Sequence, residues 1–276
     1  MAKITAADVK KLRDTTGAGM MDCKKALAEA DGDFDKAIDY LRKKGQKLSA
    51  KRADRDAKEG AVIAKVSDDR TKGVVLKLSC ETDFVAKNDN FVALANSFAD
   101  AALNNFPENT EALLALSYDD ITIGEKVTEQ TGVIGEKLEI ASYERLEATL
   151  VAPYIHMGNK AGVLVGLTVA SDDAYDAGRD AAMQVAAMRP IAVDKDGVDA
   201  TTIEKEIEIG MEQARQEGKP EAMLEKIARG KLNKFFKERT LLNQQFVKDS
   251  KKSVQDYLKT VDSDLTITEF KHVELG

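Results

Sequence analysis

The residue types that carry most enzyme chemistry are scarce in this chain. It has 276 residues but only two histidines, His156 and His272, and two cysteines, Cys23 and Cys80. No HExxH, GxSxG or GxxxxGK[ST] pattern occurs, so the signatures of a metalloprotease, an α/β-hydrolase and a P-loop are missing. The sequence therefore favours a protein that is not an enzyme and does not bind a nucleotide directly. We also expect no metal or cofactor, since two distant histidines rarely share a metal ion.

Composition and charge exclude further classes. The net charge is −7, which makes general nucleic-acid binding an unfavourable interpretation because phosphate contacts need a basic face. The two cysteines form no CxxC pair, which is typical of a protein from a reducing compartment. The N-terminal segment MAKITAADVKKLRD has no apolar signal region, and no apolar run approaches the roughly 20 residues that span a bilayer. We therefore expect a cytoplasmic protein without membrane contact.

A basic stretch lies within residues 42–55. It contains seven basic residues and no aromatic residue. One interpretation is an anion or RNA contact, and the other is a solvated linker. The absence of interleaved aromatic side chains for base stacking favours the linker, and an RNA-associated factor stays open as an alternative function. The stretch comprises Arg42, Lys43, Lys44, Lys47, Lys51, Arg52 and Arg55.

The most unusual segment is ETDFVAKN at 81–88, between a predicted strand and a predicted helix. Phe84 can fold back onto the first helical turn as a hydrophobic staple. Alternatively, Phe84 can project beside Asp83 as a knob for a partner protein. The residues alone favour packing, because exposed aromatic side chains are uncommon outside interfaces.

Two further positions have the same ambiguity. Met20 and Met21 are adjacent and cannot both face one core on a helix. One is therefore expected to be buried, and the other can offer soft apolar surface to a partner. His156, beside Gly158 in a polar turn, is either a ligand or a surface histidine.

The elements that must position these residues begin with three short helices in residues 1–45. Thr5 and Asp8 predict an N-cap and an acidic first turn. Apolar residues recur at helical spacing after them, and Gly45 is expected to end the third helix. Residues 46–59 predict a linker or a solvated helix, because they contain almost no large apolar residue.

The rest of the chain predicts an α+β core with two related subdomains, at 60–137 and 138–276. Residues 60–80 and 138–170 contain β-branched strands, and helices are expected from Asn88 and over 172–188. GVVLKLS at 73–79 and GVLVGLT at 162–168 suggest a repeated unit. Residues 201–238 predict an antiparallel helical hairpin, and the alternation from Leu265 to Val273 predicts a last strand.

Several of these segments resemble the elongation factor Ts family. The match begins with VKKLRDTTGAGMMDCKKAL and DGDFDKAIDYLRKKG in the N-terminal module. It continues through TDFVAKN at 82–88, GVLVGL at 162–167, QVAAMRP at 184–190 and FVKDSKKSV at 246–254. The order is that of the family, and the similarity extends over nearly the whole chain.

This resemblance implies a fold and a partner. The fold is a ubiquitin-associated-like three-helix module, then two related α+β subdomains with antiparallel sheets and a projecting helical hairpin. The partner is the GTPase elongation factor Tu, from which such factors release GDP. By motif match the residues that contact this partner are Arg13, Met20, Met21, Lys24, Thr82, Asp83, Phe84, Val85, Ile134, Gly135, His156 and Val247.

The match is weaker in the second subdomain. The family often has proline where this chain has Gln245 and Ser250, and histidine where it has Gln184. Lys248 also stands where some members have an apolar residue. Fewer matching residues therefore support the contacts implied for Val247 and its surroundings than support those of the TDFVAKN segment.

Overall fold

A computed structural model describes residues 4–276, beginning with three helices. Thr5 and Asp8 form a capping box at the start of the first helix, which ends at Gly17 in the left-handed conformation, as the pattern of cap residues predicts. The expectation that Gly45 ends the third helix is wrong, because Gly45 is buried inside a helix that continues to Arg52. The helices are α1 (Ala6–Thr16), α2 (Met20–Glu29) and α3 (Phe34–Arg52).

Two three-stranded antiparallel sheets form the core and confirm the α+β fold class. The first has the order β1-β2-β5 and the second the order β10-β7-β6. In each sheet a hairpin is followed by helical structure and by a strand that returns to pair with the second hairpin strand. The strands are β1 (Glu59–Val66), β2 (Lys72–Cys80), β5 (Glu139–Glu147), β6 (Leu150–Ile155), β7 (Ala161–Leu167) and β10 (Ile267–Glu274).

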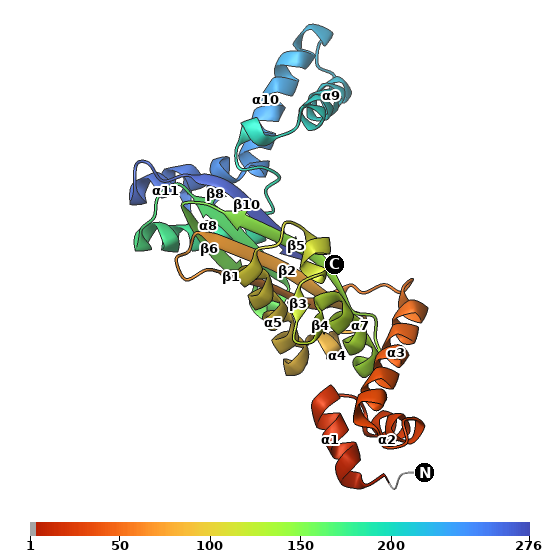
Figure 1. The fold of residues 1–276 in the computed structure, drawn as a ribbon. Helices are drawn as coiled ribbons and strands as arrows, with labels where there is room; N and C mark the ends of the chain where they lie inside the picture. The colour runs from red at the N-terminus through yellow and green to blue at the C-terminus, as the bar shows by residue number, and fades with distance from the viewer. Residues whose placement is uncertain (1–3) are drawn as a thin grey trace.

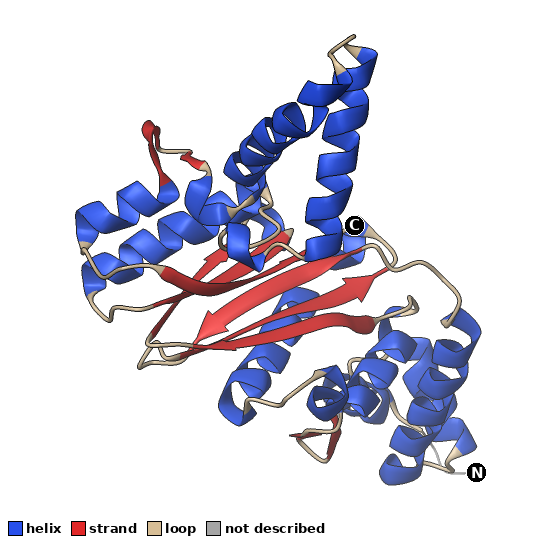
Figure 2. Ribbon diagram, turned by 90° about the horizontal axis from the view of Figure 1, so that it is seen from above, coloured by secondary structure: helices blue, strands red, loops and turns tan. Residues whose placement is uncertain are grey.

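The two sheets pack face to face between helices (Figures 1 and 2). Helix α5 (Asp89–Asn105) covers the outer face of the first sheet, and α8 (Asp172–Met188) covers the second. Gly73 and Gly162 begin the two similar segments, and both face the opposite sheet. A Cβ atom on Gly73 would lie 2.8 Å from Val151, and one on Gly162 would lie 2.9 Å from Val62. Close sheet contact therefore explains the glycine in each repeated segment.

A helical hairpin projects from the second sheet (Figure 1). It consists of α9 (Ala200–Gln216) and α10 (Glu221–Arg239), close to the expected 201–238. Around the core lie α4 (Asp83–Ala86), α6 (Thr110–Leu114), α7 (Ile123–Ile134) and α11 (Val254–Val261). Short strands β3 (Ser117–Tyr118), β4 (Ile121–Thr122), β8 (Gln245–Phe246) and β9 (Asp249–Ser253) and the 3-10 turns η1 (Met157–Asn159), η2 (Lys195–Gly197) and η3 (Leu241–Asn243) complete it.

The division of the chain into units at 1–45, 46–59, 60–137 and 138–276 stays a prediction. Sheet pairing crosses the last of these boundaries, because β5 pairs with β2 in the first sheet. Within residues 4–276, none of the helices combines the length and apolar character required to cross a lipid bilayer.

Candidate partner-binding surface

The corner after strand β2 is held by partly buried polar contacts. Thr82 caps α4 and also donates a hydrogen bond from its hydroxyl to the Glu136 carboxylate, at 2.7 Å. The same carboxylate accepts the backbone N–H groups of Glu81 and Thr82, at 3.1 and 3.0 Å. Three donors on one carboxylate fix the direction in which the chain leaves the sheet. Helix α4, which follows, is therefore presented in one orientation.

Phe84 projects from this corner into solvent. Its exposed fraction is 84%, so the interpretation that its ring packs onto the following helix is wrong. Helix α4 has only one turn, and its inward positions are taken by Val85 and Ala86, which pack against the first core. Phe84 is on the opposite side of that turn and has no core position left. The ring is free to meet another molecule.

Asp83 is next to Phe84 and has a local counter-charge. The Lys87 ammonium lies 2.6 Å from the Asp83 carboxylate, one helical turn later. This hydrogen bond and charge lower the pKa of Asp83 below its ordinary value. The acid is therefore ionised at neutral pH, and it presents a hydrogen-bond acceptor beside the exposed ring.

Helix α7 completes a groove beside the corner. Phe84, Val85 and Ile134 line one cavity of about 460 Å³, together with Gly17 from the first helix. Gly135 ends α7 with a φ of 84°, a conformation that glycine adopts without strain. The structure thus places three of the residues implied by the resemblance in this cavity, Val85 from a partly buried position, with Thr82, Asp83 and Gly135 directly beside them.

A second groove lies on the N-terminal module. Arg13, Met20, Met21 and Lys24 line it together with part of α1. The exposed fractions of Met20 and Met21 are 60% and 75%, so the expectation that one of them is buried is wrong. Both stand in the first turn of α2, whose inward positions are Cys23, Ala26 and Leu27. Two adjacent methionines and two cations therefore share one open surface.

His156 and Val247 lie apart from these two grooves. His156 is an exposed residue in the turn between β6 and β7, where its Nδ1 lies 3.2 Å from the Tyr154 hydroxyl. Val247 is 47% exposed, in the turn that joins β8 to β9. That hairpin is at the opposite end of the molecule from α1–α3 (Figure 1). The structure therefore places the twelve implied residues in at least three separate regions.

Glu81 is a central residue to which the sequence patterns assigned no role. Its carboxylate accepts hydrogen bonds from the guanidinium groups of Arg52, at 2.6 Å, and Arg55, at 3.0 Å. It also accepts one from the Lys137 backbone N–H, at 2.6 Å. The interpretation of 42–55 as a solvated linker is therefore wrong for Arg52 and Arg55, and Lys44 also pairs with Asp22. The signal was a glutamate directly before the TDFVAKN segment, but its partners are far away in sequence.

The Glu81 cluster predicts an acid-sensitive link between α3 and the core. Burial acts to raise the pKa of Glu81, but the Lys137 N–H and the two guanidinium groups outweigh it and lower that pKa to about 2. A lowered pKa contributes stability that is complete above the unfolded-state pKa of about 4.5 and is lost as pH falls toward 2. We expect Glu81→Gln to lower the free energy of unfolding at pH 7 by about 1–2 kcal/mol.

Urea unfolding of wild-type and Glu81→Gln protein between pH 3 and 7 measures this effect. The difference between the two proteins is expected to shrink as pH falls below about 4.5. Glu225→Gln is the matched control, since the Glu225 carboxylate pairs with Arg229 on an exposed surface, where such pairs contribute little. A difference that stays constant across this pH range would contradict a role for the ionised carboxylate.

Comparison with known proteins agrees with the resemblance. A family model described as Elongation factor TS matches residues 81–276. The chain is 59% identical over 276 residues to the Elongation factor Ts of Christiangramia forsetii, with all of both chains covered. It is 57% identical over 276 residues to that of Flavobacterium psychrophilum, again with complete coverage. It is 54% identical over 274 residues to that of Amoebophilus asiaticus, with 99% of each chain covered.

These matches, with the α+β core and the N-terminal helices, define the class as translation elongation factors. The chain belongs to the elongation factor Ts family. The matched range begins at Glu81, directly before the corner that carries Phe84. The full-length relatives extend the similarity over the N-terminal module as well.

Proposed function

We propose that this protein is a guanine-nucleotide exchange factor that binds elongation factor Tu in its GDP form, in the cytoplasm, and promotes GDP release. The main support for this proposal is that the Phe84 side chain is 84% exposed on a corner fixed by hydrogen bonds to Glu136. A large aromatic ring held outward on a rigid support is typical of an interface anchor. The activity needs no catalytic residue, since it depends only on contacts between two proteins.

The proposed mechanism is a competition between two bound states of the GTPase. Tightly bound GDP is retained by phosphate and magnesium contacts. A factor that prefers the nucleotide-free state weakens GDP binding, and GDP weakens binding of the factor by the same coupling free energy. Phe84 inserts between helices of the GTPase domain, and Asp83 fixes its approach. The displaced helix disturbs the magnesium and phosphate site, so charge compensation of the diphosphate is lost.

The other exposed regions supply affinity. The groove of Met20 and Met21 offers adaptable apolar surface, and Arg13 and Lys24 add charge at its rim. His156 and Val247 provide contacts outside the two grooves. Because all of these belong to one molecule, each contact raises the effective concentration of the others. The exchange step and the affinity thus reside in different parts of the chain.

The test is release of labelled GDP from elongation factor Tu of the same organism. We expect sub-stoichiometric amounts of this protein to accelerate release, because one molecule serves many GTPase molecules in turn. Acceleration only at or above a 1:1 ratio would indicate a factor that sequesters the GTPase without catalysing exchange. Salt-sensitive RNA binding lost on neutralising Lys51 and Arg52 would instead support an RNA-associated factor.

A further inference from the structure

Two glycines meet where α3 crosses α7. A Cβ atom on Gly132 of α7 would lie 2.6 Å from the Cα atom of Gly45 on α3. A Cβ atom on Gly45 would lie 3.0 Å from the Thr128 carbonyl oxygen. Distances below 3 Å to backbone cannot be relieved by turning a side chain, so the crossing needs glycine at position 132. Such an approach lets the two helices pack closer than side chains would allow.

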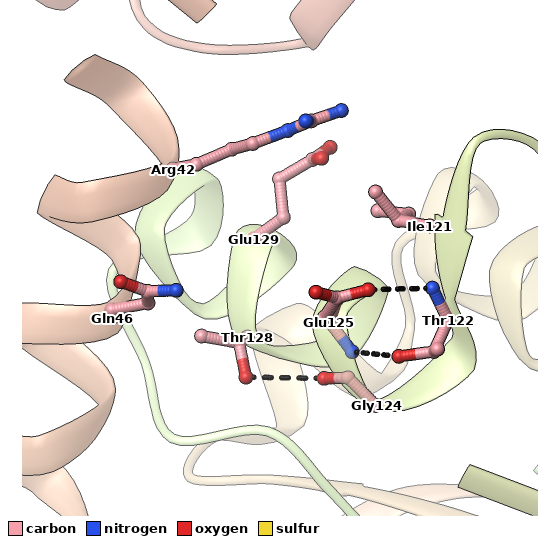
Figure 3. Close-up of a pocket in the computed structure, with 8 residues that line it drawn as sticks. All are labelled: Arg42, Gln46, Ile121, Thr122, Gly124, Glu125, Thr128 and Glu129. Carbon is pink, nitrogen blue, oxygen red and sulfur yellow. Dashed lines mark hydrogen bonds between the residues drawn. The ribbon is translucent and has the colours of Figure 1, made fainter. Parts of the chain in front are cut away.

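Contacts on both sides of this crossing join the same two parts. Val133, next to Gly132 on α7, packs against the core of the N-terminal module. Beyond the crossing, the Glu81 carboxylate binds Arg52 and Arg55 at the end of α3 and just after it. Figure 3 shows the adjoining cavity, with Arg42 and Gln46 from α3 facing residues 121–129. The module is thus docked along α7 at several points.

We infer that the α3–α7 crossing is a fixed joint, so that the methionine groove and the Phe84 corner form one preorganised binding surface. This inference rests on the proposed function and adds a positioning role for Gly45, Gly132 and Val133. Helix α7 also carries Ile134, which lines the Phe84 cavity, and the helix ends at Gly135, so one element sets both surfaces. A surface that is already ordered loses less freedom on binding than a tethered module would.

The matched substitutions are Gly132→Ala and Gly230→Ala, which place the same methyl group on two helices. The site at Gly230 is open, with nothing within 4 Å of a Cβ atom. Alanine favours helix over glycine at both positions, so Gly230→Ala is expected to raise the melting temperature by roughly 1–2 °C. Gly132→Ala is expected to lower it by roughly 4 °C, because the methyl group forces the helices apart.

The functional readout separates positioning from general stability. With Gly132→Ala we expect amide hydrogen exchange in α3 to rise at least about 10-fold, with exchange in α8 unchanged. Affinity for nucleotide-free elongation factor Tu falls roughly 10-fold, but GDP release at saturating factor stays near wild type because the Phe84 corner is retained. Met20→Ser and Met21→Ser together are expected to lower this affinity less in the Gly132→Ala protein than in wild type, because the undocked module already contributes less to binding.

Each result bears on the inference in a defined way. If Gly132→Ala changes neither amide hydrogen exchange in α3 nor affinity for elongation factor Tu, the fixed joint is overturned. If amide exchange in α3 rises but the affinity is unchanged, the role of the joint in binding is overturned. If Gly132→Ala does not fold, Gly45→Ala adds a methyl group on the α3 side of the crossing, 3.0 Å from the Thr128 carbonyl oxygen, and is judged by the same measurements. A wild-type protein that fails to accelerate GDP release would refute the proposed function. The amide hydrogen exchange and the melting temperatures of the variants would still test the joint.

Discussion

Phe84→Ala is expected to slow factor-stimulated GDP release roughly 10- to 100-fold at saturating factor, with much of the binding retained. Burying an aromatic ring contributes about 2 kcal/mol or more, and here that free energy is realised only when the GTPase adopts its displaced conformation. The substitution therefore acts on the release rate more than on affinity. Stopped-flow release of a fluorescent GDP analogue, titrated with the variant, gives both quantities.

The fold of the variant should be unaffected. Phe84 is 84% exposed, and exposed substitutions usually change the free energy of unfolding by less than about 0.5 kcal/mol. Phe84→Leu keeps part of the apolar volume and should restore part of the rate. Met223→Ala removes another exposed apolar side chain, 42% exposed on the helical hairpin, and should leave release unchanged. Wild-type rates with Phe84→Ala at saturation would remove the ring from the mechanism.

Local patterns predicted those elements whose ends are set by neighbouring residues. Helix α8 begins after the Ser171 cap and ends before Pro190, and α5 begins after the Asn88 cap, because cap and breaker residues act within one turn. The pair of similar strand segments also led to the two-sheet core. Each of these signals is contained in a few consecutive residues.

Contacts between distant segments could not be predicted in this way. Gly45 was expected to end a helix, because a glycine at a helix end and a glycine under a crossing helix give the same local pattern. Glu81 finds its donors at Arg52 and Lys137, and Glu136 lies 54 positions after Thr82. The outward direction of Phe84 follows from the positions that Val85 and Ala86 occupy in the core, which only the assembled sheet determines.

Gln184→Ala is expected to destabilise the protein by about 2–4 kcal/mol and to release the β8–β9 hairpin. Gln184 is fully buried. Its Nε2 donates to Gln244 at 3.0 Å and to the Gln245 carbonyl at 3.1 Å, and its Oε1 accepts the Val247 N–H at 2.9 Å. Alanine leaves these groups without their partner and opens a cavity. Chemical denaturation and amide exchange at Val247 measure the two effects.

Two further variants distinguish the contribution of the Gln184 hydrogen bonds to stability from that of its side-chain volume. Gln184→Met fills most of the space but cannot replace the amide, so most of the loss should remain. Gln216→Ala removes an exposed glutamine whose side chain bonds only to Glu212 among the described residues and should change stability by less than about 0.5 kcal/mol. Since Gln184 holds the backbone of Val247, its loss should also weaken binding to elongation factor Tu while GDP release at saturation is kept. Equal losses of affinity and saturated release rate would contradict a separation between the anchoring end of the molecule and the Phe84 corner.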